Sequence, residues 1–194
     1  MPHLSPQTLT QTEQRTLLYA TRRNLRDHLI YSLALGTGLR LAEIVGLNVG
    51  DVYTPDGKPK SRIRLRPEIA KNGRAGDVFL PDALLVKFRK FWRHKATRRE
   101  GLRPEDPLFC SQSRTRISPR RVQFAFRNWQ VKAGFDRLYP FHALRHCAIT
   151  NVYRASRDLF LAQRFARHVS PLTTTVYTHP SDEELFAKVR GLHC

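Results

Sequence analysis

Six side chains that can bind or attack a phosphodiester occur in a fixed order along the chain of 194 residues. They are two arginines, a lysine, two histidines and finally a tyrosine: Arg40, Lys71, His142, Arg145, His168 and Tyr177. Cationic side chains neutralise the charge that builds on phosphorus, and histidines move protons. A tyrosine hydroxyl can attack phosphorus when a base or nearby cations favour its phenolate. The set predicts chemistry on a phosphodiester, with a DNA backbone as the substrate.

The histidines also have interpretations that involve no phosphodiester. His142 and His146 are spaced like two ligands on the helix of a zinc protease. That motif needs a glutamate beside the first histidine, and Ala143 stands there, so the sequence argues against a metal site. His142 taken alone fits a polar network in the core equally well.

The other members have ordinary interpretations too. Arg40 follows a Gly-Thr-Gly turn, and Glu43, three residues on, is placed to orient its guanidinium or simply to form a surface ion pair with it. Lys71 alone is typical of a solvated hairpin lysine. Tyr177 alone is typical of a half-buried tyrosine, which stays protonated at neutral pH.

The charge of the chain indicates a polyanionic partner. Its formal net charge is +18, and its isoelectric point is near 10.9. Nucleic acid is the first candidate partner and an anionic membrane surface the second. Arg74, Arg120 and Arg121 are candidates for DNA contacts outside the reacting group, although solvated helix charges are as common.

Two features bear on location. No apolar run approaches the roughly 20 residues of a membrane span, and the first residues do not begin a signal sequence. Three scattered cysteines predict neither a disulfide framework nor a zinc knuckle, and Cys147 is expected in the core. We expect a cytoplasmic protein that is associated with the nucleoid when bound to DNA.

Capping residues and hydrophobic spacing predict helices along most of the chain. A capping box of Thr10 and Glu13 opens the first helix, and Asn24 caps a second that ends at residues 36–38. Further helices are expected from residue 40, from residue 84 to a basic end at residue 99, over 118–129, over 141–153 and over 159–165. Ser170 and Pro171 precede a short turn that carries Tyr177, and Ser181 with Glu184 forms a last capping box.

Alternating apolar residues predict one small sheet. Ile63 and Leu65 alternate with polar residues, as do Val78 and Leu80, and residues 71–73 stand at the hairpin turn between them. The predicted fold class is therefore mainly α with a small antiparallel β-sheet. We found no internal repeat or domain boundary, so one domain over residues 1–194 is expected.

In combination, these motifs resemble the catalytic domain of the tyrosine site-specific recombinases, the phage integrases and their relatives. The resemblance is carried by GLRLAEI at residues 38–44, Lys71 in a hairpin, HALRH at 142–146, and His168 nine residues before Tyr177. It runs in order from about Leu9 to the end of the chain. Each motif alone is weak, whereas five in order are specific.

The resemblance implies a fold, an activity and a role for each residue. It implies the fold of a DNA breaking and rejoining enzyme, with Tyr177 as the nucleophile that forms a 3′-phosphotyrosyl bond. The other five residues would activate the phosphate, with Glu43 in support. No metal and no other cofactor is implied, and the partners would be double-stranded DNA and further copies of the chain in a synaptic tetramer. The expected activity is strand exchange at specific sites of a mobile or switching element.

Two departures from the family pattern qualify that expectation. Relatives usually show Leu-Gly-His where this chain has Ala166, Arg167 and His168, so a bulky cation that could contact DNA stands beside the site. The usual N-terminal core-binding domain is absent from this sequence, as expected for a catalytic fragment or a short recombinase. A catalytically idle DNA-binding regulator and an activity like that of type IB topoisomerases are the alternative functions.

Overall fold

The computed structural model describes residues 8–73, 75–177 and 189–190. Most of the described chain is helical, and one antiparallel pair of strands completes it, which confirms the predicted fold class. The elements are α1 (Gln11–Thr21), α2 (Leu25–Thr37), α3 (Leu41–Gly46), α4 (Val49–Val52), β1 (Arg62–Leu65), η1 (Lys71–Gly73), β2 (Gly76–Phe79), α5 (Asp82–Arg98), α6 (Pro119–Lys132), α7 (His142–Ser156), α8 (Leu159–Ala166) and α9 (Leu172–Thr175). No helix among these residues is both long and apolar enough to cross a bilayer.

The helix starts follow the capping residues. The Thr10 side chain accepts from the Glu13 backbone, and the Glu13 carboxylate accepts from the Thr10 backbone, so the predicted capping box opens α1. Asn24 caps α2, and Ser118 with proline at the next position caps α6. The predicted capping box at residues 181–184 lies outside the described residues.

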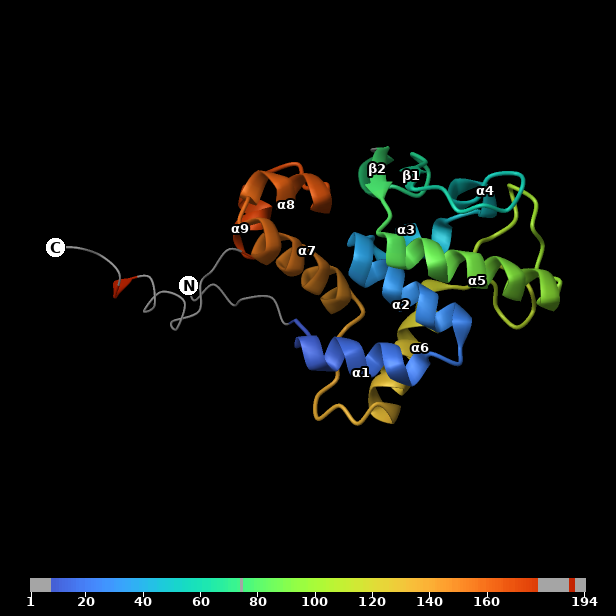
Figure 1. Cartoon of the computed structure of the whole chain (residues 1–194), viewed down its shortest axis with the longest axis horizontal. Coiled ribbons are helices and arrows are strands. Elements are labelled where there is room, and N and C mark those ends of the chain that lie inside the picture. The colour runs from blue at the N-terminus through green and yellow to red at the C-terminus, as the bar shows by residue number, and fades with distance from the viewer. Residues whose placement is uncertain (1–7, 74, 178–188, 191–194) are drawn as a thin grey trace. The chain divides into compact units, whose positions relative to one another are not determined.

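Contacts divide the chain into two compact units, and the division falls inside α7. The larger unit is Gln7–Ala148, and the smaller one contains the described residues from Ile149 onward. In the larger unit α2 contacts α1, α3, α5 and α6, and Figure 1 shows it between α1 and α5. Its buried residues, among them Leu29, Ile30 and Leu33, are the centre of the larger core, which also contains Cys147, as predicted.

The smaller unit has its own apolar cluster, in which Ile149 of α7 packs with Ala162, Ala166 and Tyr177. The exposed face of α8 bears Phe160, which is 71% exposed. Among the described residues of this unit, the buried cluster joins the second half of α7 to α8 and to the segment that carries Tyr177.

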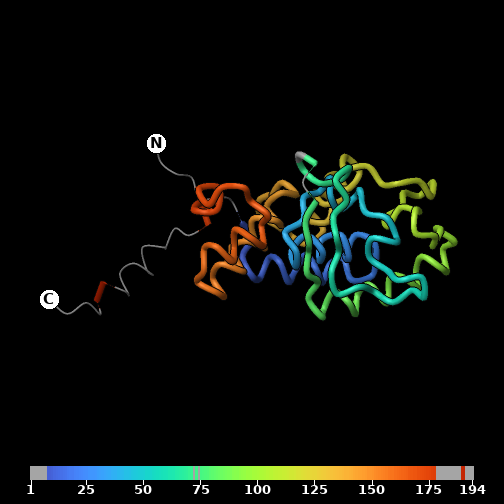
Figure 2. The backbone as a smooth tube through the Cα atoms, turned by 90° about the horizontal axis from the view of Figure 1, so that it is seen from above, coloured from blue at the N-terminus to red at the C-terminus, as the bar shows by residue number. Residues whose placement is uncertain are grey.

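The sheet has the predicted strands but a different connection. Ile63 of β1 lies opposite Val78 of β2, and both are buried. The described residues 66–73 form no tight hairpin turn: the chain leaves β1 after Leu65, continues through Arg66 and Pro67, and passes through the 3-10 turn η1, at the upper edge of the larger unit in Figure 2. Proline cannot extend a strand's hydrogen bonds, and Gly73 supplies the positive φ of +66° that turns the chain.

Candidate active site

Arg40 stands at the start of α3, where Glu43 holds it. The backbone N–H of Arg40 donates to one carboxylate oxygen of Glu43 at 2.8 Å, and its Nη1 donates to the other at 3.1 Å. Glu43 is only 2% exposed, whereas the Arg40 side chain is 24% exposed. The carboxylate therefore fixes both the helix start and the orientation of a guanidinium that remains accessible.

Arg145 lies on α7 and is held by the turn that precedes Arg40. It is 2% exposed, and its Nη1 donates to the carbonyl oxygen of Gly38. Gly38 ends α2 with a φ of +63°, in the left-handed region that glycine adopts without strain. The turn that aims Arg40 thus also anchors Arg145, which brings two residues far apart in the sequence to one place.

His142 lies one helical turn before Arg145 on α7 and interacts electrostatically with three positive side chains. The residue is exposed, yet partial desolvation lowers the pKa of its imidazole below the ordinary value, and the charges of Arg145, Arg40 and Lys71 lower it further. Lys71 itself is exposed at the start of η1. Four of the six predicted residues are therefore gathered in the larger unit, around a histidine that is neutral at neutral pH.

His146 packs its ring edge-on against that of His142, with ring centroids 4.6 Å apart. Burial, followed by the charges of His142 and Arg145, lowers the pKa of His146 to about 4. No group of three or more histidine, cysteine or acidic side chains within the described residues could hold a metal ion. The pair thus has the spacing of two ligands without a third beside it in that part of the chain.

The remaining two predicted residues lie together in the smaller unit. The rings of His168 and Tyr177 are stacked, with centroids 6.3 Å apart and planes 22° apart. The buried hydroxyl of Thr174 is 2.9 Å from Nδ1 of His168, and the backbone N–H of Tyr177 donates to the carbonyl of Thr174. Thr174 of α9 therefore contacts both residues: its hydroxyl orients the His168 ring, and its carbonyl holds the backbone of Tyr177.

The described candidates for DNA contacts lie on two different helices. Arg120 and Arg121 are exposed at the start of α6, where they line a hollow of about 340 Å³ with Ser118 and Phe124. Arg167 ends α8 with a φ of +54°. Arg74 lies outside the described residues.

Two features were not identified from the sequence. Thr174 carries no signal of its own, because a threonine six residues after a histidine is an ordinary coincidence of composition. The other is the set of basic residues at alternate positions from Lys60 to Arg66, beside the apolar Ile63 and Leu65 that predict the strand.

Comparison with known proteins shows the family of the chain. Residues 7–184 match the model of the phage integrase family. The tyrosine recombinase XerC of Neisseria meningitidis serogroup B is 31% identical over 160 residues, which are 79% of this chain and 48% of the relative. The XerC of Proteus mirabilis is 32% identical over 168 residues, 86% of this chain and 51% of the relative. The chain thus spans about half the length of the curated relatives it matches.

Solved structures show the same fold. The XerA recombinase superposes with a TM-score of 0.80 at 26% identity, over 97% of this chain and 66% of that one. The XerH recombinase, in a post-cleavage complex with palindromic difH substrate, gives a TM-score of 0.77 at 22% identity, over 96% of this chain and 53% of that one.

Proposed function

Because the chain belongs to the phage integrase family, we propose that it is a site-specific DNA recombinase, which breaks and rejoins strands through a covalent bond to Tyr177. The observation that carries the proposal is the position of His142 near three cations: its pKa is lowered by desolvation and then by the charges of Arg145, Arg40 and Lys71. A solvated surface histidine would lack these neighbours. A neutral histidine among three cations supplies a proton acceptor and a place for a phosphate together.

The proposed reaction is a transesterification, in which one phosphodiester bond forms as another breaks. The Tyr177 oxygen attacks phosphorus and forms a 3′-phosphotyrosyl bond, while the bond from phosphorus to the 5′-oxygen breaks. His142 accepts the tyrosine proton, and Lys71 gives a proton to the departing 5′-oxygen. The 5′-hydroxyl of a second strand then attacks the phosphotyrosine and releases Tyr177.

The arginines and His168 act on the oxygens that do not leave. Arg40 and Arg145 bind the non-bridging oxygens, whose negative charge grows in the transition state, and His168 hydrogen-bonds to the phosphate. The ion pair with Glu43 supports this role, because it orients the Arg40 guanidinium before DNA binds. A guanidinium that is already ordered loses less conformational entropy on binding.

The proposed substrate is double-stranded DNA. The XerH relative is in a complex with its difH substrate, and the net charge of +18 is consistent with a polyanionic partner. Exchange between two DNA sites requires more than one copy of the chain, so we propose assembly on DNA into the synaptic tetramer implied by the family.

Trapping the covalent adduct tests the proposed function. The probe is a random-sequence pool of nicked duplexes, in excess EDTA, and the readout is a protein–DNA adduct that survives denaturant. The parent chain should form the adduct. Tyr177→Phe should bind DNA as well as the parent and form none, because it lacks only the attacking oxygen. Tyr153→Phe is the matched control, because Tyr153 packs in the same cluster, and it should keep the adduct.

Three other results would point elsewhere. An adduct that persists in Tyr177→Phe moves the nucleophile to another residue. DNA binding without an adduct from the parent indicates a catalytically idle regulator. An adduct accompanied by relaxation of supercoiled DNA, with no exchange between duplexes, indicates an activity like that of type IB topoisomerases. Adduct formation that needs added metal would restore the interpretation of His142 and His146 as ligands.

A further inference from the structure

A row of four cations runs along the segment that contains β1. Lys60, Arg62, Arg64 and Arg66 occupy alternate positions, and alternate side chains of an extended segment point to one face. Ile63 and Leu65, between them, are buried in the core. The burial of the apolar residues thus places the basic residues on the opposite face of this segment.

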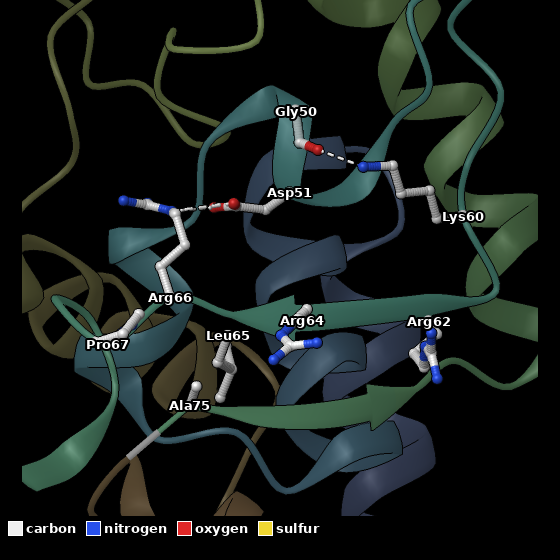
Figure 3. Close-up of a pocket in the computed structure, with 9 residues that line it drawn as sticks. All are labelled: Gly50, Asp51, Lys60, Arg62, Arg64, Leu65, Arg66, Pro67 and Ala75. Carbon is white, nitrogen blue, oxygen red and sulfur yellow. Dashed lines mark hydrogen bonds and ion pairs between the residues drawn. The ribbon is translucent and has the colours of Figure 1, made fainter. Parts of the chain in front are cut away.

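The row borders a hollow of about 460 Å³ between β1 and α4 (Figure 3). All four cations line it, and Asp51 of α4 is the one carboxylate among the lining residues. The hollow is therefore strongly positive, and it lies in the same compact unit as Arg40 and Lys71. The connection that leaves β1 at Arg66 leads directly to Lys71.

The two ends of the row are fixed by internal contacts. The Lys60 ammonium donates to the carbonyl of Gly50 at 2.6 Å. The Arg66 guanidinium donates to Asp51 at 3.0 Å and to the carbonyl of Gly46 at 3.0 Å. These bonds tie β1 to α3 and α4, and they give Lys60 and Arg66 a structural role.

The middle of the row has no comparable role. Arg62 makes one long, exposed ion pair, 3.6 Å from Asp77. Arg64 lies exposed in the hollow, and its side chain has no hydrogen bond or ion pair within the described part of the chain. A guanidinium carries five N–H donors, so both side chains keep most of their donors for a ligand. Packing and internal pairing therefore do not account for Arg64.

We propose that this basic row binds successive backbone phosphates of the DNA, apart from the phosphodiester that Tyr177 attacks, and this inference rests on the proposed function. Residues two apart on a strand are spaced by about 6.6 Å, so the row presents charges at a regular interval. Such an interval suits a polyanion with repeated charges better than a single small anion. Arginine is also the side chain whose fork best matches a phosphate.

The test is the salt dependence of DNA binding by the full chain. The variants are the double substitution Arg62→Gln with Arg64→Gln, and Arg89→Gln as the matched control. Arg89 is an exposed arginine of α5 that does not line the hollow. Dissociation constants for a labelled duplex are measured over a range of salt concentrations, and circular dichroism checks that each variant is folded.

Each phosphate contact contributes about one unit to the slope of log affinity against log salt. The double variant should therefore lose about two units of slope and bind duplexes of unrelated sequence more weakly by the same factor. Arg89→Gln should keep the parent slope. A double variant with the parent slope, or an equal loss in Arg89→Gln, would overturn the proposal, because the row would then contribute no more than diffuse charge.

Inorganic phosphate separates a DNA site from a site for free anions. It is titrated into the chain without DNA, and the Arg64 guanidinium signal is followed by NMR. Saturation by phosphate at micromolar concentration, together with an unchanged DNA slope in the double variant, would replace the proposal by a small-anion site. The salt-slope test of the basic row and the adduct test of the proposed function can also give opposite results. A parent that forms no adduct but loses slope in the double variant would refute the proposed cleavage and leave the row as a DNA contact.

Discussion

Lys71 is the residue whose proposed role can be separated most sharply from a general effect of charge. A DNA 5′-alkoxide is a poor leaving group and needs a proton, whereas a thiolate, with a thiol pKa near 8.5, leaves unaided. Lys71→Ala should slow cleavage of ordinary DNA by about 10² to 10⁴, the usual effect of a positioned acid. Replacing the bridging 5′-oxygen by sulfur should recover most of that loss in single-turnover cleavage.

Arg40→Ala is the control for the sulfur substitution. In the proposed mechanism its defect is unneutralised charge on the non-bridging oxygens, which sulfur at the bridging position does not relieve. If sulfur rescues both variants equally, or neither, then Lys71 is not the acid, and its charge acts only in binding the DNA backbone.

Thr174 is expected to act through His168 as a positioning residue. It is fully buried, and its hydroxyl lies 2.9 Å from Nδ1 of His168, so it is placed to fix the orientation of the imidazole ring. Thr174→Val keeps the shape of the side chain and removes the hydroxyl, and a ring misplaced by about 1 Å can cost on the order of 10² in rate. Cleavage should therefore slow about tenfold to a hundredfold in Thr174→Val and recover in Thr174→Ser.

The melting temperature distinguishes this role from a structural one. If Thr174→Ser melts below the parent and still cleaves at the parent rate, the hydroxyl positions His168. If the rates of the two variants simply follow their stabilities, Thr174 only packs the smaller unit.

His146 should make the larger unit sensitive to acid. Its pKa is about 4 in the folded chain, against about 6.5 in an unfolded one. Between these values the unfolded chain binds more protons, so stability is full above about pH 6.5 and falls as the pH drops toward 4. The loss attributable to this one group is at most about 3 kcal/mol. Urea unfolding of the parent and of His146→Gln at several pH values measures it, and a variant that keeps the full acid loss would contradict it.

At the scale of elements, Arg167 shows why the family pattern has glycine where it does. Arg167 ends α8 at a φ of +54°, where an L-residue is strained and glycine is not. Arg167→Gly should raise the free energy of unfolding by about 1 kcal/mol in denaturant titrations. Arg99 ends α5 at the same φ, so Arg99→Gly is a matched control and should stabilise similarly.

The same pair of variants tests whether the cation at residue 167 contacts DNA. A loss of DNA affinity in Arg167→Gly that is absent in Arg99→Gly would explain why an arginine is kept at a strained position. If both variants bind DNA as tightly as each other, Arg167 strains the backbone without contributing to DNA binding.

The elements differ in how far the sequence could predict them. Thr10, Asn24 and Ser118 mark helix starts through local hydrogen bonds, so α1, α2 and α6 follow from residues a few positions apart. The path from Arg66 to Gly73 depends on bonds to Asp51 and Gly46 from another part of the chain, and local turn rules did not capture it. The short helix α4 was missed for a similar reason, since its start donates to the carbonyl of Asp106.

The candidate site shows the same limit. The order of six residue types was enough to suggest phosphodiester chemistry, and the spacing of Arg40 and Glu43 predicted their ion pair. The bond from Arg145 to Gly38 joins residues more than a hundred positions apart and has no local signal. Thr174 was missed because the contact between its hydroxyl and His168 depends on the three-dimensional path of the chain and has no sequence motif.

For the whole molecule, we expect salt to act in opposite directions on the stability of the fold and on the proposed DNA binding. With a net charge of +18, the folded chain repels itself, because folding brings the cations closer together. Several of the ion pairs that oppose this repulsion are exposed on both sides, such as Lys58 with Asp56 and Arg103 with Glu105. Exposed pairs of this kind each contribute about 0 to 1 kcal/mol. The repulsion should therefore outweigh them at low salt.

Added salt should stabilise the free chain and destabilise its complex with DNA. The screening length falls from about 30 Å at 0.01 M salt to about 8 Å at 0.15 M, which weakens repulsion across the molecule while short pairs such as Arg66 with Asp51 are affected less. The melting temperature of the free chain should rise over this range. With saturating duplex it should start higher and fall, because the proposed DNA binding favours the folded state and releases counterions. Calorimetry with and without DNA measures both curves, and a free chain that melts earlier as salt is added would mean that its internal ion pairs, rather than its net charge, dominate its electrostatics.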